Sequence, residues 1–287
     1  MKPRYLLNTR SVQRHFDRAA TSFEAADFVH EVTRDGLFAR LEPMRLDARQ
    51  VLDLGCATGA ALPRLEKRFR RARIVGVDIS ANMLQKAQAH RGWFSRLSFV
   101  HSDARALPIA DHSVDLVFAN LLLPWIDDPS AIAREVCRVL RKDGLFVFSG
   151  LGPDSLRELR AAWAAVDNYA HVNEFPDMHN IGDSLVQSGL RDPVLDVDRL
   201  QVSYSDSAAL YRDLKAAGGR NALTAQRKSL TGKQAFARMQ DELWRFAERN
   251  SLQLDLELVY GHCWGRGPAS AATDVRIDAG AIPVRRR

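Results

Sequence analysis

Short apolar runs and amphipathic stretches alternate along residues 45–150, and this alternation predicts the architecture. The apolar runs are nearly continuous, as in strands that are covered on both faces; they span residues 49–55, 72–80, 97–103, 113–120 and 144–150. The segments 61–70, 80–90 and 129–140 repeat their apolar positions at helical spacing. Strands that alternate with helices in this way predict βαβ units and a parallel sheet with helices on both faces.

The flanking sequence predicts helical additions to this sheet. Residues 8–41 carry apolar side chains at helical spacing. After residue 150 the pattern predicts two helices, a strand, a helical stretch and a closing strand, over 155–167, 181–190, 194–205, about 206–250 and 252–267. The alternating leucines of the closing strand favour a half-exposed or edge strand. We therefore predict a Rossmann-like, doubly wound α/β fold with a seven-stranded sheet.

Three segments follow from this pattern. An N-terminal helical segment spans 1–44, one α/β domain spans 45–267, and a tail spans 268–287. Within the domain, a helical insertion at about 206–250 separates the last two strands. We expect this insertion to act as a lid over a ligand site.

The composition is that of a globular protein, with 46% apolar and 26% charged residues in a chain of 287. No apolar run is long enough to span a membrane, and the N-terminus lacks the apolar core of a signal peptide. We therefore expect a cytoplasmic protein without a membrane partner. The three cysteines are scattered, which argues against a disulfide framework and against a metal site.

The net charge of +6 is unevenly distributed. Residues 220–238 contain five basic side chains and no acidic one. Such a segment suits nucleic acid, an acidic protein or an anionic substrate, or it is a basic surface without a target. No RNA-binding motif accompanies it, so we expect no nucleic acid partner.

A glycine-containing loop follows the first predicted strand and reads DLGCATG over residues 53–59. Ligands of doubly wound folds bind at the carboxyl ends of the strands, and glycine lets the backbone approach them. The spacing is neither the dinucleotide pattern nor the phosphate-binding loop with its lysine. A tight turn without a ligand is the alternative reading of this loop.

Two further acids follow the next two strands. Asp78 ends the second strand, where a carboxylate accepts hydrogen bonds from both hydroxyls of a ribose. Asp103 follows the third strand, where a carboxylate accepts a hydrogen bond from an adenine amino group. Each acid alone is more often a helix cap or a loop acid than a ligand contact. Acids at the ends of three successive strands, with Asp53 as the first, instead indicate one ligand.

Together, DLGCATG, VDIS, SDARALP and VDLVFANLLLPWIDD resemble the successive motifs of class I S-adenosylmethionine-dependent methyltransferases over residues 45–150. The resemblance implies S-adenosylmethionine as the cofactor, with its amino-acid end at the glycine loop, its ribose on Asp78 and its adenine near Asp103. The implied cofactor-binding residues are Asp53, Gly55, Cys56, Ala57, Gly59, Asp78, Ile79, Met83, Asp103, Ala104 and Asn120. Ala57 stands where members often have glycine, which we expect to be tolerated unless its φ is positive.

The flanks resemble the malonyl-[acyl-carrier protein] O-methyltransferases of biotin synthesis in HFDRAATSFE, NLLLPW, residues 155–185 and DLKAAGGRNAL. This resemblance implies methyl esterification of the free carboxylate of a malonyl thioester on acyl carrier protein or coenzyme A. The same flanks resemble a mitochondrial complex I assembly factor described as a protein arginine hydroxylase. A small-molecule methyltransferase is a further alternative. An RNA methyltransferase is disfavoured because residues 120–123 read NLLL rather than an NPPY-like motif.

A malonyl carboxylate is already ionised at neutral pH, so we expect no acid or base catalyst. An arginine fork suits a carboxylate best. The candidate carboxylate contacts are Arg18 and Arg160, with Arg157 and Arg220 as further choices, and Trp125 and His171 are assigned to the substrate pocket. We expect Tyr5 and Phe16 to close over the cofactor. The basic segment 220–238 is expected to steer an acidic carrier protein to the site.

Overall fold

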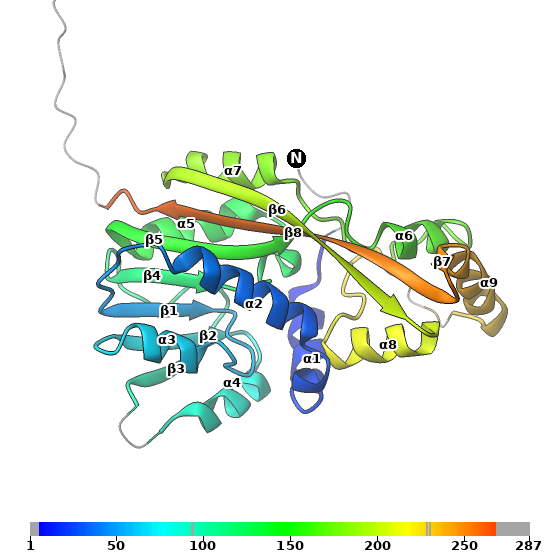
Figure 1. The fold of residues 1–287 in the computed structure, drawn as a ribbon, viewed down its shortest axis with the longest axis horizontal. Helices are drawn as coiled ribbons and strands as arrows, with labels where there is room; N and C mark the ends of the chain where they lie inside the picture. The colour runs from blue at the N-terminus through cyan, green and yellow to red at the C-terminus, as the bar shows by residue number, and fades with distance from the viewer. Residues whose placement is uncertain (1–5, 93–94, 228, 230, 268–287) are drawn as a thin grey trace, which may run out of the picture.

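The computed structural model describes residues 6–92, 95–227, 229 and 231–267, and these fold around one continuous sheet (Figure 1). The strands lie in the order β3-β2-β1-β4-β5-β8-β6, and the short β7 pairs with β8. The strands are β1 Gln50–Leu54, β2 Arg73–Asp78, β3 Leu97–His101, β4 Val114–Ala119, β5 Leu140–Leu151, β6 Arg191–Tyr204, β7 Ala247–Glu248 and β8 Ser251–Trp264. The first five are parallel, and β8 and β6 continue the sheet antiparallel. The predicted Rossmann-like fold is confirmed.

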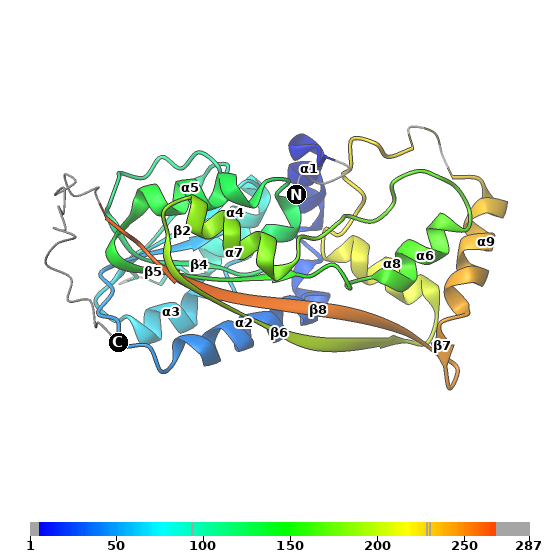
Figure 2. The same cartoon turned by 90° about the horizontal axis from the view of Figure 1, so that it is seen from above.

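Helices cover both faces of this sheet (Figure 2). They are α1 Thr9–Ala19, α2 Phe28–Leu41, α3 Leu62–Arg68, α4 Ala81–Ala87, α5 Pro129–Val139, α6 Arg157–Ala164, α7 Met178–Gln187, α8 Ser207–Ala216 and α9 Lys233–Trp244, with 3-10 turns at Phe23–Ala25, Gln88–His90 and Leu123–Trp125. Apolar side chains of α2 and α3 fill one face, and those of α5 and α7 fill the other. None of the helices in the described residues is both long and apolar enough to cross a membrane.

The predicted helical stretch 8–41 is interrupted in the structure. The chain leaves α1 after Ala19, forms a short 3-10 turn and starts α2 at Phe28. The interruption has a physical reason, because the two helices bury their apolar sides against different partners. Ala19 and Phe23 pack against Met83 of α4, whereas Leu37 of α2 packs onto the sheet.

The reading of β8 as an edge strand is wrong, because β8 lies between β5 and β6, and β6 forms the edge. The alternation of its leucines has another cause. The beginning of β8 extends beyond the parallel strands, and there Leu252 and Leu254 are covered on one side by α6, α8 and α9. We call this part of the molecule the outer lobe: α6, α8, α9, β7 and the adjoining ends of β6 and β8. It contains the predicted insertion, while the predicted tail 268–287 lies outside the described residues.

Candidate functional site

A first cavity opens at the carboxyl ends of β1, β2 and β4 and is closed by α1 and α2. Nine of the eleven predicted cofactor residues line it: Asp53, Gly55, Cys56, Ala57, Asp78, Ile79, Asp103, Ala104 and Asn120. The parallel register explains this gathering, because Asp53 pairs with Gly76 of β2 and with Phe118 of β4, so the three strands end at one edge. The wall that faces this edge includes two residues that the sequence patterns did not single out, His30 and Arg34 of α2.

The glycine loop bends sharply along the cavity floor. Gly55 and Gly59 have φ of 75° and 85°, and Ala57 between them has φ of 46°. The left-handed conformation costs a residue with a Cβ about 1–2 kcal/mol. The φ of Ala57 is therefore positive, which is the case in which we did not expect alanine to be tolerated here. Part of the cost is offset where the Ala57 N–H donates to Asp78 Oδ2 at 2.9 Å.

Asp53 and Asp78 place two buried carboxyl groups in this cavity. Burial, with the charge of Asp78, raises the pKa of Asp53 to about 7. Burial also raises the pKa of Asp78 to about 6, although backbone N–H groups of Ser80 and Ala57 bond to it. One oxygen of Asp53 has no partner among the described residues. A buried carboxylate with a free oxygen suits a cationic ligand, such as the ammonium end of S-adenosylmethionine.

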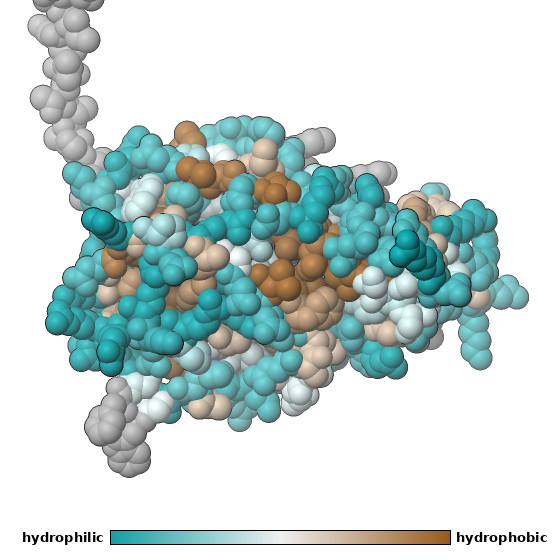
Figure 3. Space-filling model, viewed as in Figure 1, coloured by the Kyte–Doolittle hydropathy of each residue, from teal (hydrophilic) through white to brown (hydrophobic). Residues whose placement is uncertain are grey.

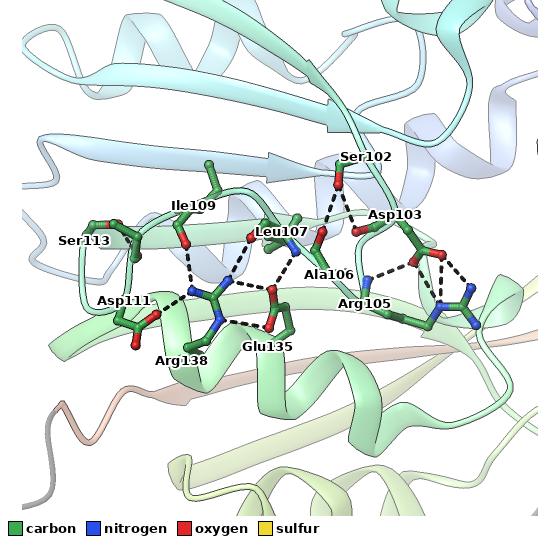
Figure 4. A network of polar contacts seen from close by, with 11 residues as sticks. Ser102, Asp103, Arg105, Ala106, Leu107, Ile109, Asp111, Ser113, Glu135 and Arg138 are labelled. Atoms are coloured by element: carbon green, nitrogen blue, oxygen red, sulfur yellow. Dashed lines mark hydrogen bonds and ion pairs between the residues drawn. The ribbon is translucent and has the colours of Figure 1, made fainter.

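Asp103 lies on the loop after β3 and is held by Arg105 (Figure 4). The Arg105 Nε and backbone N–H donate to Asp103 Oδ1 at 3.0 and 2.9 Å. This contact lowers the pKa of the Asp103 carboxyl group, which therefore stays ionised. Arg105 also reaches Thr9 at the start of α1, at 3.0 Å. Asp103 therefore lines the cavity as part of an ion pair rather than as a free acceptor.

Three of the predicted cofactor residues have structural roles in the described fold. Gly59 and Met83 do not line the cavity: a Cβ on Gly59 would lie 2.9 Å from Leu62, and Met83 is fully buried against α1. Asn120 lines the cavity, but both ends of its amide are occupied. Its Nδ2 donates to the His30 carbonyl at 2.9 Å, and its Oδ1 accepts from Ser149 at 2.8 Å.

A second cavity adjoins the first and is enclosed by α2, α8, the turn at Leu123–Trp125 and the outer ends of β6 and β8. Its wall is mostly apolar; the side chains include Phe28, Val29, Leu151, Leu159, Val202, Leu210, Leu214, Leu254 and Leu256. Figure 3 shows hydrophobic side chains gathered between α2 and α8 on this face of the molecule. His30, Leu121 and Trp125 line both cavities and mark the place where they meet.

Only some of the predicted substrate contacts line a cavity. His171 lines the second cavity, where it bonds to Asp167 at 2.8 Å and stacks on Trp163 at 3.8 Å. Arg220 also lines it, whereas Arg18 and Arg160 line neither cavity. Arg18 is exposed, and Arg160 donates to backbone carbonyls, among them that of Asn173 at 3.0 Å.

The other predicted substrate and cofactor contacts also differ in whether they line a cavity. Arg157 pairs with Asp255 at 2.7 Å and with Glu158 at 2.9 Å, away from both cavities. Phe16 lines the first cavity and meets Trp125 edge-on at 5.0 Å, while Tyr5 lies outside the described residues. Across the part of the chain that the structure describes, no His, Cys, Asp and Glu side chains cluster as metal ligands.

Sequence comparison identifies relatives over nearly the whole chain. Residues 52–148 match the family model described as a methyltransferase domain. The chain is 38% identical to a malonyl-[acyl-carrier protein] O-methyltransferase of Methylovorus sp., over 91% of this chain and 90% of that protein. It is also 38% identical to the protein of that name from Halorhodospira halophila, over 98% of this chain and 97% of the relative.

Solved structures share the fold at low sequence identity. The YcgJ protein of Bacillus subtilis superposes with a TM-score of 0.58 at 16% identity, over 81% of this chain and 98% of that one. A phosphoethanolamine N-methyltransferase of Haemonchus contortus, solved with S-adenosylhomocysteine, gives 0.55 at 14% identity, over 88% of this chain and 60% of that one. These neighbours bear on the fold alone.

Proposed function

The chain belongs to the malonyl-[acyl-carrier protein] O-methyltransferase family, and from this premise we propose the reaction that it performs. It transfers a methyl group from S-adenosylmethionine to the free carboxylate of a malonyl thioester on acyl carrier protein, an early step of biotin synthesis. The observation that supports this most directly is the pair of adjoining cavities, one with buried acids and one with apolar walls.

The residues of the first cavity fit the cofactor. S-adenosylmethionine, when bound, supplies an electrophilic methyl group on a sulfonium. The free oxygen of Asp53 receives the ammonium of the amino-acid end, and Asp78 keeps lone pairs for the ribose hydroxyls. The Gly55 backbone lies at the floor, where a Cβ would crowd Leu122 at 3.1 Å. These residues bind and orient the cofactor, and they take no proton from the substrate.

The second cavity fits an acyl thioester with a free carboxylate. The carboxylate is ionised at neutral pH, so no general base is needed and the protein contributes orientation. The apolar walls exclude water from the place where the carboxylate approaches the sulfonium. This favours a reaction in which both charges are neutralised. Among the arginines considered from the sequence, we assign Arg220 to this cavity in place of Arg18 and Arg160. Its charge attracts the anionic substrate.

The alternative functions are not favoured. Arginine hydroxylation by an assembly factor and methylation of a small molecule both use this fold. The relatives that cover 88–98% of this chain, however, are named malonyl-[acyl-carrier protein] O-methyltransferase. Acyl carrier protein is the partner that those names imply. A preference for the carrier over coenzyme A is part of the proposal.

Intact-mass spectrometry tests the reaction. Malonyl-loaded carrier protein is incubated with this protein and S-adenosylmethionine, beside acetyl-loaded carrier, which has no free carboxylate. A gain of one methyl group on the malonyl form alone is the expected result. Cofactor binding without a mass gain on either carrier would overturn the substrate assignment and leave the cofactor site standing.

A further inference from the structure

Three described residues line both cavities, and only His30 and Trp125 among them have a side-chain N–H. The methyl group has to pass between cofactor and substrate where the cavities meet. We infer that His30 and Trp125 bind the reacting carboxylate at this junction and aim one of its oxygens at the methyl group. The inference rests on the proposed function and names the groups that orient its substrate.

The fold holds the His30 backbone at the junction through a chain of hydrogen bonds from the sheet. Ser149 of β5 donates to Asn120 Oδ1 at 2.8 Å, and Asn120 Nδ2 donates to the His30 carbonyl at 2.9 Å. The Phe23 ring packs edge-on against the imidazole, with the two ring centroids 4.8 Å apart. Asn120 therefore positions the start of α2, beside its place in the wall of the first cavity. Asn120 thus holds the backbone of His30, and Phe23 packs against its ring.

The polar atoms of both side chains are left for a ligand. His30 Nδ1 is buried, and neither ring nitrogen has a hydrogen-bond partner among the described residues. Burial, aided by the charge of Arg34, lowers the pKa of His30 to about 4, so the ring is neutral near pH 7. The Trp125 indole packs edge-on against Phe16, and its N–H likewise has no partner in the described part of the chain.

Neutral donors suit this reaction better than an arginine on the attacking oxygen. The O–CH3 bond forms while the S–CH3 bond breaks, and the electron pair of that bond stays on sulfur. The carboxylate therefore loses negative charge towards the transition state, and no proton moves. A cation on the reacting oxygen would stabilise the ground state more than the transition state and slow the transfer. Arg220 lines only the second cavity, so its charge acts on binding.

Steady-state kinetics separates these roles. His30→Phe keeps a ring against Phe23 and removes the donor, so we expect kcat to fall about 100-fold, as for a misplaced nucleophile. His30→Gln restores a donor and should recover part of that loss, and Trp125→Phe should lower kcat about tenfold, as for the loss of one hydrogen bond. Arg220→Gln should raise KM for the thioester and leave kcat nearly unchanged. His179→Ala, at an exposed histidine outside both cavities, is the matched control.

Two binding measurements exclude a merely structural effect. The dissociation constant of S-adenosylhomocysteine should stay within about twofold in each variant, because the acids that hold it are untouched. In the ¹⁵N-histidine spectrum of the wild type with S-adenosylhomocysteine, malonyl-pantetheine should shift the signal that His30→Gln removes. Acetyl-pantetheine, without the carboxylate, should not shift it.

The outcomes distinguish this inference from the proposed function. Methyl transfer by the wild type together with an unchanged kcat in His30→Phe would overturn the inference alone. A His30 signal that stays unmoved when malonyl-pantetheine is added would overturn it as well. A wild type that methylates no malonyl carrier overturns the proposed function, and this inference falls with it.

Discussion

Asp53 couples cofactor binding to pH, because the fold raises the pKa of this carboxyl to about 7 and that of neighbouring Asp78 to about 6. In the ligand-free protein, both carboxyl groups bind a proton more tightly than an exposed aspartate does. The contribution of these groups to stability is therefore complete below the usual carboxyl range and is lost as the pH rises through their raised pKa values. A cationic ligand reverses this preference. We expect the affinity for S-adenosylhomocysteine to fall about tenfold from pH 7 to pH 5.5, a range in which its ammonium stays charged.

Isothermal titration calorimetry across this range measures the effect. Asp53→Asn is the informative variant, because the amide keeps the shape and removes the titrating group. It should bind more weakly at pH 7 and retain only the shallower pH dependence due to Asp78, whose raised pKa is the lower of the two. An unchanged slope in Asp53→Asn would show that another group controls the pH dependence.

Single residues also show where sequence reasoning ends. Asp53, Asp78 and Asp103 were predictable because each lies at or just beyond the carboxyl end of a strand, and the register of a parallel sheet brings these ends together. His30 and Arg34 were not, since the face that a helix turns to a cavity depends on how the whole helix packs. Their spacing of one helical turn was a signal, but only once α2 was known to cross the carboxyl edge of the sheet.

At the scale of elements, a side chain of the neighbouring helix α5 holds the loop from Ser102 to Ser113 (Figure 4). Arg138 of α5 donates to the carbonyls of Leu107 and Ile109 at 2.9 and 2.7 Å, and it also contacts Glu135 and Asp111. Arg138→Ala leaves these carbonyls without their donor. We expect a loss of about 1–3 kcal/mol in the free energy of unfolding, together with faster hydrogen exchange in the loop and weaker cofactor binding at Asp103.

Arg134, on the same helix, provides the matched control. It forms one exposed pair with Asp128 at 3.7 Å, which is worth little in water. Urea unfolding of Arg134→Ala should match the wild type within about 0.5 kcal/mol. If both variants lose the same stability, the loop is not specifically held by Arg138.

The type of each element was largely predictable from the sequence. Which elements lie next to each other in the sheet was less predictable. Continuous apolar runs identified the parallel strands because helices cover both of their faces. The alternation in β8 indicated one covered face, but it does not distinguish an edge strand from an inner strand that extends beyond its neighbours. The two-residue β7 is too short to leave any pattern in the sequence.

In the molecule as a whole, the N-terminal segment and the insertion form one cover over the cavities. The Asn8 N–H donates to the Ala222 carbonyl at 2.7 Å, and the Thr224 N–H donates to the Leu6 carbonyl at 2.7 Å. Ser22 donates to the carbonyl of Ala216 at the end of α8, at 3.2 Å. These contacts join segments about 200 residues apart, so no local pattern could predict them. The predicted lid is thus tied to α1, although its motion stays a prediction.

Several exposed basic side chains lie on this cover. Arg18, Arg212, Lys215 and Arg220 are exposed and have no carboxylate partner among the described residues. They lie on α1, α8 and the loop after α8, and both α8 and this loop contribute residues to the wall of the second cavity. The basic segment singled out in the sequence contributes Arg220 here, while residues 228 and 230 of that segment lie outside the described residues. We expect an acidic carrier protein to dock on this side of the molecule.

Reversing two of these charges tests the docking of the carrier. In Arg212→Glu/Lys215→Glu, on the exposed side of α8, we expect KM for malonyl carrier protein to rise about tenfold, because repulsion slows the encounter of the two proteins. The effect should shrink as salt is added. Malonyl-pantetheine has no carrier to repel, so its KM should stay within about twofold. Arg70→Glu/Arg71→Glu makes the same charge change between α3 and β2, where β2 begins and far from the carboxyl ends of the strands, and should affect neither substrate. Equal losses on carrier and pantetheine substrates would mean that α8 shapes the cavity rather than the docking surface.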